Sequence, residues 1–136
     1  HSLRKYNNID LLVINENELR HEMRDREGEI NFLSFKLLKE LKVKVLVVTR
    51  GNNGAILLRQ GKSIIECPAF ANKIIDKVGA GDAMLAVISL CLKAKIPEDL
   101  SLLLGSLASA NSVESIGNSD FIDKKKLLRQ LEFMTK

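Results

Sequence analysis

Tryptophan is absent from this 136-residue chain, tyrosine occurs once, and aromatic residues make up only 4% of the sequence. Proteins that bind nucleic acid commonly stack bases on aromatic side chains, so the shortage argues against a nucleic-acid partner despite a net charge of +4. The basic residues are spread along the chain, as expected of a solvated surface. No apolar run approaches the roughly 20 residues that cross a bilayer, so we expect no membrane partner.

Cysteine is also scarce. Cys67 and Cys91 are isolated in apolar surroundings and lack the spacing of a metal site or a redox pair. Two reduced core cysteines are typical of a cytoplasmic protein. The remaining composition, 46% hydrophobic and 28% charged, is that of a soluble globular chain, and the length suits one domain over residues 1–136.

Apolar runs predict strands that alternate with helices. Residues 9–14 and 43–49 are mostly apolar, and the second run is rich in β-branched side chains, as expected of buried parallel strands. Between them, residues 27–41 carry an apolar stripe at helical spacing. The three elements together predict a β-α-β unit with a right-handed crossover.

A hairpin and several helices are predicted for the rest of the chain. Two short apolar runs, residues 55–58 and 63–67, flank a turn at Arg59-Gln60-Gly61-Lys62. Helices are predicted over residues 81–94, 97–115 and 123–133. The predicted fold class is therefore α/β, with parallel strands, a β-hairpin and C-terminal helices.

The most informative stretch is Asp76-Lys77-Val78-Gly79-Ala80-Gly81-Asp82, at the mouth of the predicted helix 81–94. Gly79 and Gly81 lack a Cβ, so the backbone can turn tightly and bring its amides close to a ligand. The unpaired N–H groups and the dipole of a helix start favour phosphate. Because phosphate repels a carboxylate, a functional Asp82 is better explained as a proton acceptor. A capping Asp and an ordinary Gly-Ala-Gly turn remain alternatives.

Two other phosphate-binding motifs do not fit this stretch. Met84 occupies the third small position of a G-x-G-x-x-G fingerprint, and helices follow in place of a strand that ends in an acid. No G-x-x-x-x-G-K-[ST] sequence occurs, which excludes a Walker A loop.

Polar residues follow both predicted parallel strands. Ligands of open α/β sheets bind beyond the carboxyl ends of the strands, so Asn15 and Glu18 after the first strand, and Thr49 after the second, predict a common cleft. The residues alone leave other roles open, namely a helix cap for Asn15 and a solvent-facing acid for Glu18. They equally allow a satisfied strand-end hydroxyl for Thr49 and turn formers at Gly51 and Gly54.

Three motifs, in this order, resemble those of the ribokinase family of sugar and nucleoside kinases, also called the PfkB family. Residues 76–82 match the signature D-T-x-G-A-G-D, except that Lys77 stands where the family usually has Thr. Residues 15–18 contain N-x-x-E, and residues 49–54 contain T-x-G-x-x-G. The loop, with Val48-Thr49-Arg50-Gly51 before it, looks most like the heptose-phosphate kinase branch.

The resemblance implies transfer of a phosphoryl group from ATP to a hydroxyl of a sugar or sugar phosphate. Asp82 would accept the hydroxyl proton, and the amides of Gly79, Ala80 and Gly81 would form an anion hole. The nucleotide would be bordered by Thr49, Gly51, Gly54 and Ser106. Close helix packing explains the small residues around Ser106 equally well.

Magnesium is the second cofactor that the resemblance implies. Asn15 and Glu18 would help to hold Mg²⁺ and phosphate through water, which suits an ion that dehydrates reluctantly.

The resemblance covers almost the whole chain, but only about the C-terminal half of a ribokinase-like α/β sandwich. The other half would carry the first strands and most of the sugar pocket, so we expect the chain to be inactive alone. The start at His1-Ser2, without Met, fits a piece of a longer polypeptide, although natural processing would leave the same trace.

Two further hypotheses remain. The chain is a non-catalytic nucleotide-binding or assembly domain of a larger multifunctional protein, or a structural fragment that self-associates. Strand surface without its usual cover favours a homodimer or the exchange of an element between copies.

Overall fold

A sheet covered by helices and a pair of packed helices make up the two parts of the chain. The computed structural model describes residues 10–70 and 80–114. It separates the chain into two units, His1–Ala69 and Phe70–Lys136. We name them the sheet unit and the helical unit.

The sheet unit has four strands in the order β1-β2-β3-β4. β1 (Leu11–Asn15) pairs in parallel with β2 (Val45–Thr49), as the predicted β-α-β unit requires. β2 then pairs antiparallel with β3 (Ala55–Leu58), and β3 pairs antiparallel with β4 (Ile65–Cys67). The predicted hairpin is confirmed. The antiparallel β2–β3 pair follows from its short connection, because a parallel crossover needs a dozen or more residues.

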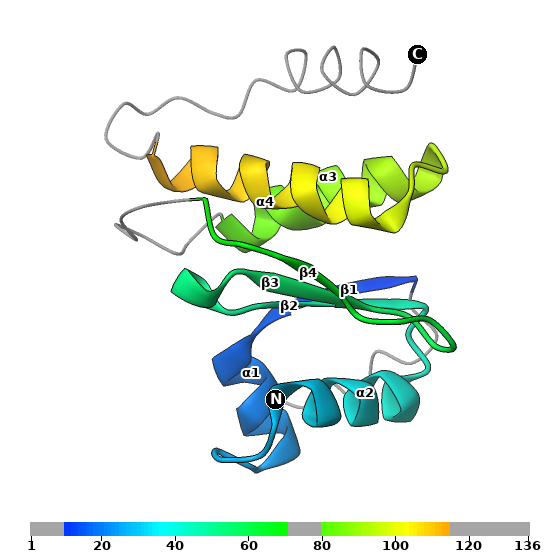
Figure 1. Cartoon of the computed structure of the whole chain (residues 1–136), viewed down its shortest axis with the longest axis vertical. Coiled ribbons are helices and arrows are strands. Elements are labelled where there is room, and N and C mark those ends of the chain that lie inside the picture. The colour runs from blue at the N-terminus through cyan, green and yellow to red at the C-terminus, as the bar shows by residue number, and fades with distance from the viewer. Residues whose placement is uncertain (1–9, 71–79, 115–136) are drawn as a thin grey trace. The chain divides into compact units, whose positions relative to one another are not determined.

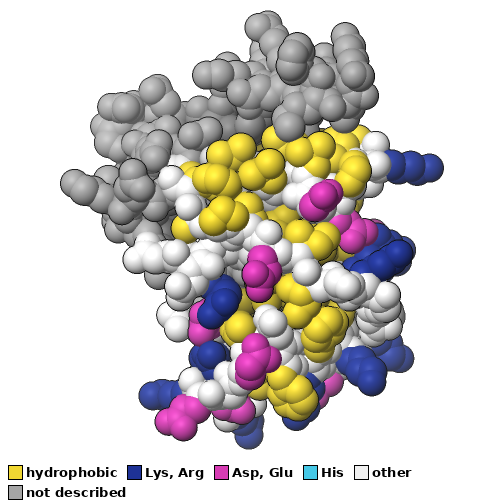
Figure 2. All heavy atoms as spheres, viewed as in Figure 1, with side chains coloured by type: hydrophobic (Ala, Val, Ile, Leu, Met, Phe, Trp, Pro, Cys, Tyr) yellow, Lys and Arg dark blue, Asp and Glu magenta, His cyan; other side chains and the backbone are white. Residues whose placement is uncertain are grey.

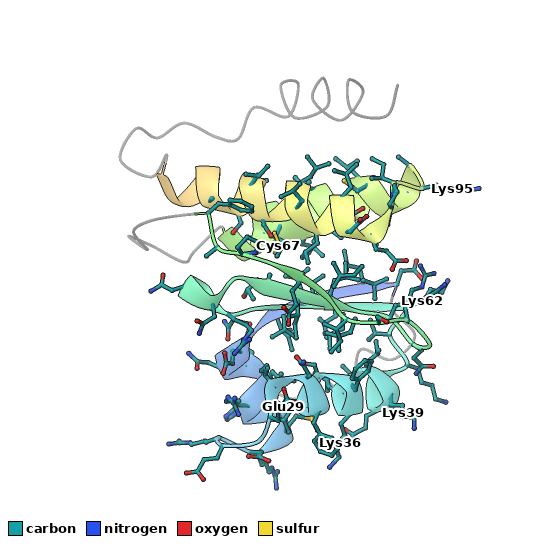
Figure 3. All side chains as sticks on the ribbon, viewed as in Figure 1. Glu29, Lys36, Lys39, Lys62, Cys67 and Lys95 are labelled. Atoms are coloured by element: carbon teal, nitrogen blue, oxygen red, sulfur yellow. The ribbon has the colours of Figure 1, made fainter. Side chains whose placement is uncertain are left out.

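Helices α1 (Glu16–Met23) and α2 (Ile30–Leu41) lie between β1 and β2 in the chain and cover one face of the sheet (Figure 1). The predicted helix 27–41 is confirmed except at its start. Glu29 caps α2, because its carboxylate accepts hydrogen bonds from the amides of Asn31 (3.1 Å) and Phe32 (2.8 Å). Figure 3 shows Glu29 at the beginning of α2, with Lys36 and Lys39 on its outer side.

The core of the sheet unit forms where the apolar stripe of α2 meets the strands. Every residue of Val45–Val48 and Ala55–Leu58 is buried, as expected of central strands with uninterrupted apolar sequence. Full burial of a leucine side chain contributes about 1.5–3 kcal/mol, so the fully buried leucines of this core stabilise it strongly. They are Leu19, Leu37, Leu38, Leu41, Leu46 and Leu58.

The helical unit contains α3 (Ala80–Lys93) and α4 (Glu98–Glu114), each within one residue of its predicted bounds. They pack closely at Gly105, where a Cβ would lie 2.6 Å from Cγ1 of Ile88. Figure 2 shows an apolar area over α4. Leu107 of α4 is among the exposed large apolar side chains. The predicted helix 123–133 lies outside the described residues.

The two cysteines are free and buried, Cys67 at the end of β4 (Figure 3) and Cys91 in α3. Burial raises the pKa of the Cys91 thiol, and a hydrogen bond with Ser101 opposes part of this shift. Across residues 10–70 and 80–114, no helix has the length and apolar character needed to cross a membrane.

Candidate functional site

The carboxyl ends of β1 and β2 lie side by side. Asn15, the last residue of β1, is paired in register with Thr49, the last residue of β2. The hydroxyl of Thr49 donates a hydrogen bond to the carbonyl oxygen of Ile14 (3.4 Å), which ties the two strand ends together. The polar residues that the sequence analysis assigns to a common cleft therefore share one edge of the sheet.

Asn15 and Glu18 form a capping box at the start of α1. Oδ1 of Asn15 accepts a hydrogen bond from the Glu18 amide (2.7 Å), and Oε1 of Glu18 accepts one from the Asn15 amide (2.9 Å). Both residues are exposed. The cap uses Oδ1 of Asn15 and one carboxylate oxygen of Glu18, which leaves the other Glu18 oxygen for a metal ion or one of its water ligands. The described residues contain no group of three or more His, Cys, Asp or Glu side chains able to hold a metal ion.

The connection between β2 and β3 is a tight turn, Arg50–Gly54. The Arg50 amide donates to the carbonyl of Gly54 (2.7 Å), and the Asn53 amide donates to the carbonyl of Arg50 (2.9 Å). Gly51 and Gly54 have positive φ values of 56° and 86°. A Cβ at Gly54 would also overlap the carbonyl oxygen of Cys67. The backbone therefore requires glycine at position 54 whether or not a ligand binds there.

A network of three charged side chains joins α1 to this turn. Glu16 accepts hydrogen bonds from Nε of Arg20 at one carboxylate oxygen (2.9 Å) and from Nε of Arg50 at the other (3.3 Å). Burial raises the pKa of Glu16, but the hydrogen bonds and charges of the two arginines outweigh it and bring the pKa below its ordinary value. The carboxylate is thus ionised at neutral pH and bound by one arginine of α1 and by Arg50 at the end of β2.

No motif in the sequence predicts this network as a whole. One signal was available for half of it, because Glu16 and Arg20 have the i, i+4 spacing of a helical ion pair. Glu16 and Arg50 lie 34 residues apart, so their contact depends on the strand register.

In the helical unit, α3 begins at Ala80 and places Gly81 and Asp82 in its first turn. Both are exposed, and a Cβ at Gly81 would meet nothing within 4 Å. The amides of a first turn have no partner within the helix and point toward an anion. Asp82 also suits the positive end of the helix dipole, so its position agrees with both interpretations in the sequence analysis. Gly79 lies outside the described residues.

Ser106 is buried in α4, and its hydroxyl has no hydrogen-bond partner within the part of the chain that the structure describes. Its neighbour Gly105 makes the close approach to Ile88, which supports a packing role for the small residues of α4. The candidate residues thus form two groups. One lies at the strand ends of the sheet unit, and the other lies in α3 and α4 of the helical unit.

Solved structures share this fold. The chain is similar to a ribokinase from Arabidopsis thaliana, solved with ribose and ATP, with 25% identity and a TM-score of 0.74. The similarity covers 91% of this chain and 41% of that one. It is also similar to phosphofructokinase-2 from Escherichia coli, solved with potassium, with 19% identity and a TM-score of 0.77. That match covers 98% of this chain and 43% of the enzyme. The fold is therefore ribokinase-like.

Residues 2–125 match the pfkB family of carbohydrate kinases, and the chain belongs to that family. Among curated proteins it is similar to the bifunctional protein HldE of Hahella chejuensis, with 33% identity over 93 residues, and to that of Aeromonas salmonicida, with 30% identity over 117 residues. These matches cover 68% and 85% of the chain. The chain spans only 20% and 25% of the two relatives.

Proposed function

We propose that the chain forms the nucleotide-binding and catalytic-base part of an ATP-dependent sugar kinase. The observation that carries this proposal is the start of α3, where Gly81 leaves open space beside the first-turn amides and Asp82 stands exposed next to it. A phosphate can approach this backbone without meeting a side chain at position 81, and a carboxylate is within one residue to receive a proton.

In the proposed reaction, a hydroxyl oxygen of the sugar attacks the γ-phosphorus of ATP. A new oxygen–phosphorus bond forms, the bond to the bridging oxygen breaks, and ADP leaves with that electron pair. Asp82 takes the hydroxyl proton. The amides of Gly79, Ala80 and Gly81 stabilise the negative charge on the transferred group.

The strand ends of the sheet unit supply the proposed nucleotide and metal contacts. Thr49, Gly51 and Gly54 would border the nucleotide. In the helical unit taken by itself, Ser106 is a further proposed nucleotide contact. Asn15 and Glu18, which cap α1, would help to hold hydrated Mg²⁺. Bound Mg²⁺ would neutralise charge on the phosphates.

The proposed substrate is a sugar phosphate of the heptose-phosphate class. Its support is the loop sequence described above together with the match to HldE proteins. ATP as phosphoryl donor is supported by the Arabidopsis ribokinase that was solved with ATP. The proposed compartment is the cytoplasm, where two free, buried cysteines stay reduced.

Titration of the 136-residue chain with Mg·ATP, followed by calorimetry and backbone amide shifts, tests the binding part of this proposal. We expect weak binding, with shifts at Gly81, Asp82 and Gly51, and none at Gly61 in the β3–β4 turn. Gly81→Val should weaken binding, because a branched side chain would occupy the space that the phosphate needs. Unchanged affinity in this variant would contradict the proposed phosphate site.

No phosphoryl transfer to a sugar is expected from the 136-residue chain by itself. Robust turnover by the purified chain would overturn the view that the sugar pocket lies elsewhere. Binding without any transfer in a longer protein that carries a sugar-binding part would favour a non-catalytic nucleotide-binding domain.

A further inference from the structure

Glu16 links two segments that the proposed function requires to hold the nucleotide and its metal. It is the first residue of α1, directly after Asn15, and it binds Arg50, the residue directly after Thr49. Each of its carboxylate oxygens accepts from a different arginine. Its side chain and that of Arg50 are both 27% exposed, so solvent screens the pair less than it screens a fully exposed one.

The ion pair with Glu16 also restrains the Arg50–Gly54 turn, because the backbone of Arg50 is part of that turn. Its amide donates to the carbonyl of Gly54 and its carbonyl accepts from the amide of Asn53, which are two of the three backbone hydrogen bonds that close Arg50–Gly54. Restraining the Arg50 side chain therefore also restrains the backbone groups of Arg50 that form hydrogen bonds within the turn. The neighbouring Gly51 has no side chain that could anchor the turn.

Arg20 holds the other side of Glu16 in place. Its Nη1 donates to the carbonyl oxygens of Gly28 (2.9 Å) and Asp25 (3.5 Å) in the α1–α2 connection. That connection is itself closed by Asp25, whose Oδ1 accepts from the amides of Gly28 (2.7 Å) and Glu27 (3.0 Å). The carboxylate of Glu16 is thus tied to a closed turn at one oxygen and to the Arg50–Gly54 turn at the other.

We propose that Glu16 is a positioning residue that holds the Arg50–Gly54 turn in its nucleotide-binding shape before the nucleotide arrives. This inference rests on the proposed function, because it needs the turn to border a nucleotide. Both carboxylate oxygens of Glu16 accept from arginines, so the proposed role is to position the turn and not to contact the nucleotide. A turn that is already ordered loses less conformational freedom on binding, so the network strengthens nucleotide affinity without adding a contact.

A second ion pair supplies a matched control. Asp10 and Lys44 form a 3.2 Å pair directly before β1 and β2, at the amino ends of the same two strands. Their side chains are 82% and 71% exposed, and the turn closed by Arg50 lies at the opposite ends of these strands. Asp10→Asn therefore breaks a link between β1 and β2 without changing the Arg50–Gly54 turn.

The first measurement is hydrogen exchange at the amides of Asn53 and Gly54 in the nucleotide-free chain. These amides close the turn by donating to Arg50 and Gly51. Glu16→Gln should speed their exchange several-fold, whereas Asp10→Asn should not. Unaltered exchange in Glu16→Gln would overturn the positioning role, whether or not the chain binds nucleotide.

The second measurement is the Kd for Mg·ATP at a temperature where all variants remain folded. Glu16→Gln should raise the Kd about threefold to tenfold, and the same change in an Arg50→Gln background should add less than about twofold. A role in stability alone would leave the Kd unchanged. Additive effects of the two substitutions, or a wild-type Kd in Glu16→Gln, would contradict the inference. A wild-type chain that fails to bind Mg·ATP would instead refute the proposed function.

Discussion

The turn between β2 and β3 depends on the absence of a side chain at Gly54. Its φ of 86° and ψ of −142° lie near a region that essentially only glycine adopts, and such backbone strain costs about 1–3 kcal/mol in another residue. A Cβ would also overlap the carbonyl oxygen of Cys67 and approach Cα of Pro68 to 3.0 Å. Overpacking of this kind typically adds about 1–3 kcal/mol. Gly54→Ala should therefore lower the free energy of unfolding by about 2–6 kcal/mol.

Gly61→Ala is the matched control for this prediction. Gly61 also has a positive φ, 75°, but a Cβ there would meet nothing within 4 Å. Only the cost of the left-handed backbone remains, about 1–2 kcal/mol. The chain has no tryptophan, so urea unfolding is best followed by far-UV circular dichroism. Equal losses of stability in the two variants would refute the steric argument and leave backbone conformation as the whole effect.

Three other predictions concern packing, pH and assembly. Gly105→Ala should destabilise the helical unit by about 1–3 kcal/mol in thermal unfolding, because its Cβ would lie 2.6 Å from Ile88; a rise in Tm would contradict it. The amides of Gly28 and Glu27 lower the pKa of Asp25 below 3.8, so its carboxylate stabilises the fold above that pH. This contribution is lost as the pH falls through the lower pKa of the folded state. Between neutral pH and about pH 2, the free energy of unfolding should therefore decrease less in Asp25→Asn than in the wild type. The chain should dimerise or exchange an element between copies at the β1 edge of the sheet. A molar mass of the monomer alone, measured by light scattering at high micromolar concentration, would disprove this.

Long apolar segments were the predictable part of the fold. β1, β2, β3 and the helices α2, α3 and α4 have largely apolar sequence, as expected of elements that pack against others, and the hairpin turn contains Gly61. α1 could not be predicted in the same way beyond its start at Asn15. Among its eight residues only Leu19 is buried, so its periodicity is weak and its capping box is the main sequence signal. The start of α2 was placed too early because glutamate is not a usual capping residue.

The candidate site was predictable only where it follows from strand ends. Asn15 and Thr49 each follow an apolar run, so their place at one edge of the sheet could be inferred before their register was known. The contact between Glu16 and Arg50 could not be predicted from the sequence. It depends on the register of the two parallel strands and on the direction in which the chain continues after each strand. Gly54 had a turn signal, but its need for glycine comes from Cys67, thirteen residues away and on another strand.

The proposed role of Asp82 is that of the catalytic base of a sugar kinase. Its most direct test is kcat for ADP release with a sugar phosphate and Mg·ATP, in a protein that joins this chain to a sugar-binding part. Asp82→Asn should lower kcat by about two to four orders of magnitude and keep nucleotide affinity. Asp99→Asn, in the exposed first turn of α4, is the matched control and should leave kcat unchanged. A kcat in Asp82→Asn within about twofold of the wild type would contradict the account.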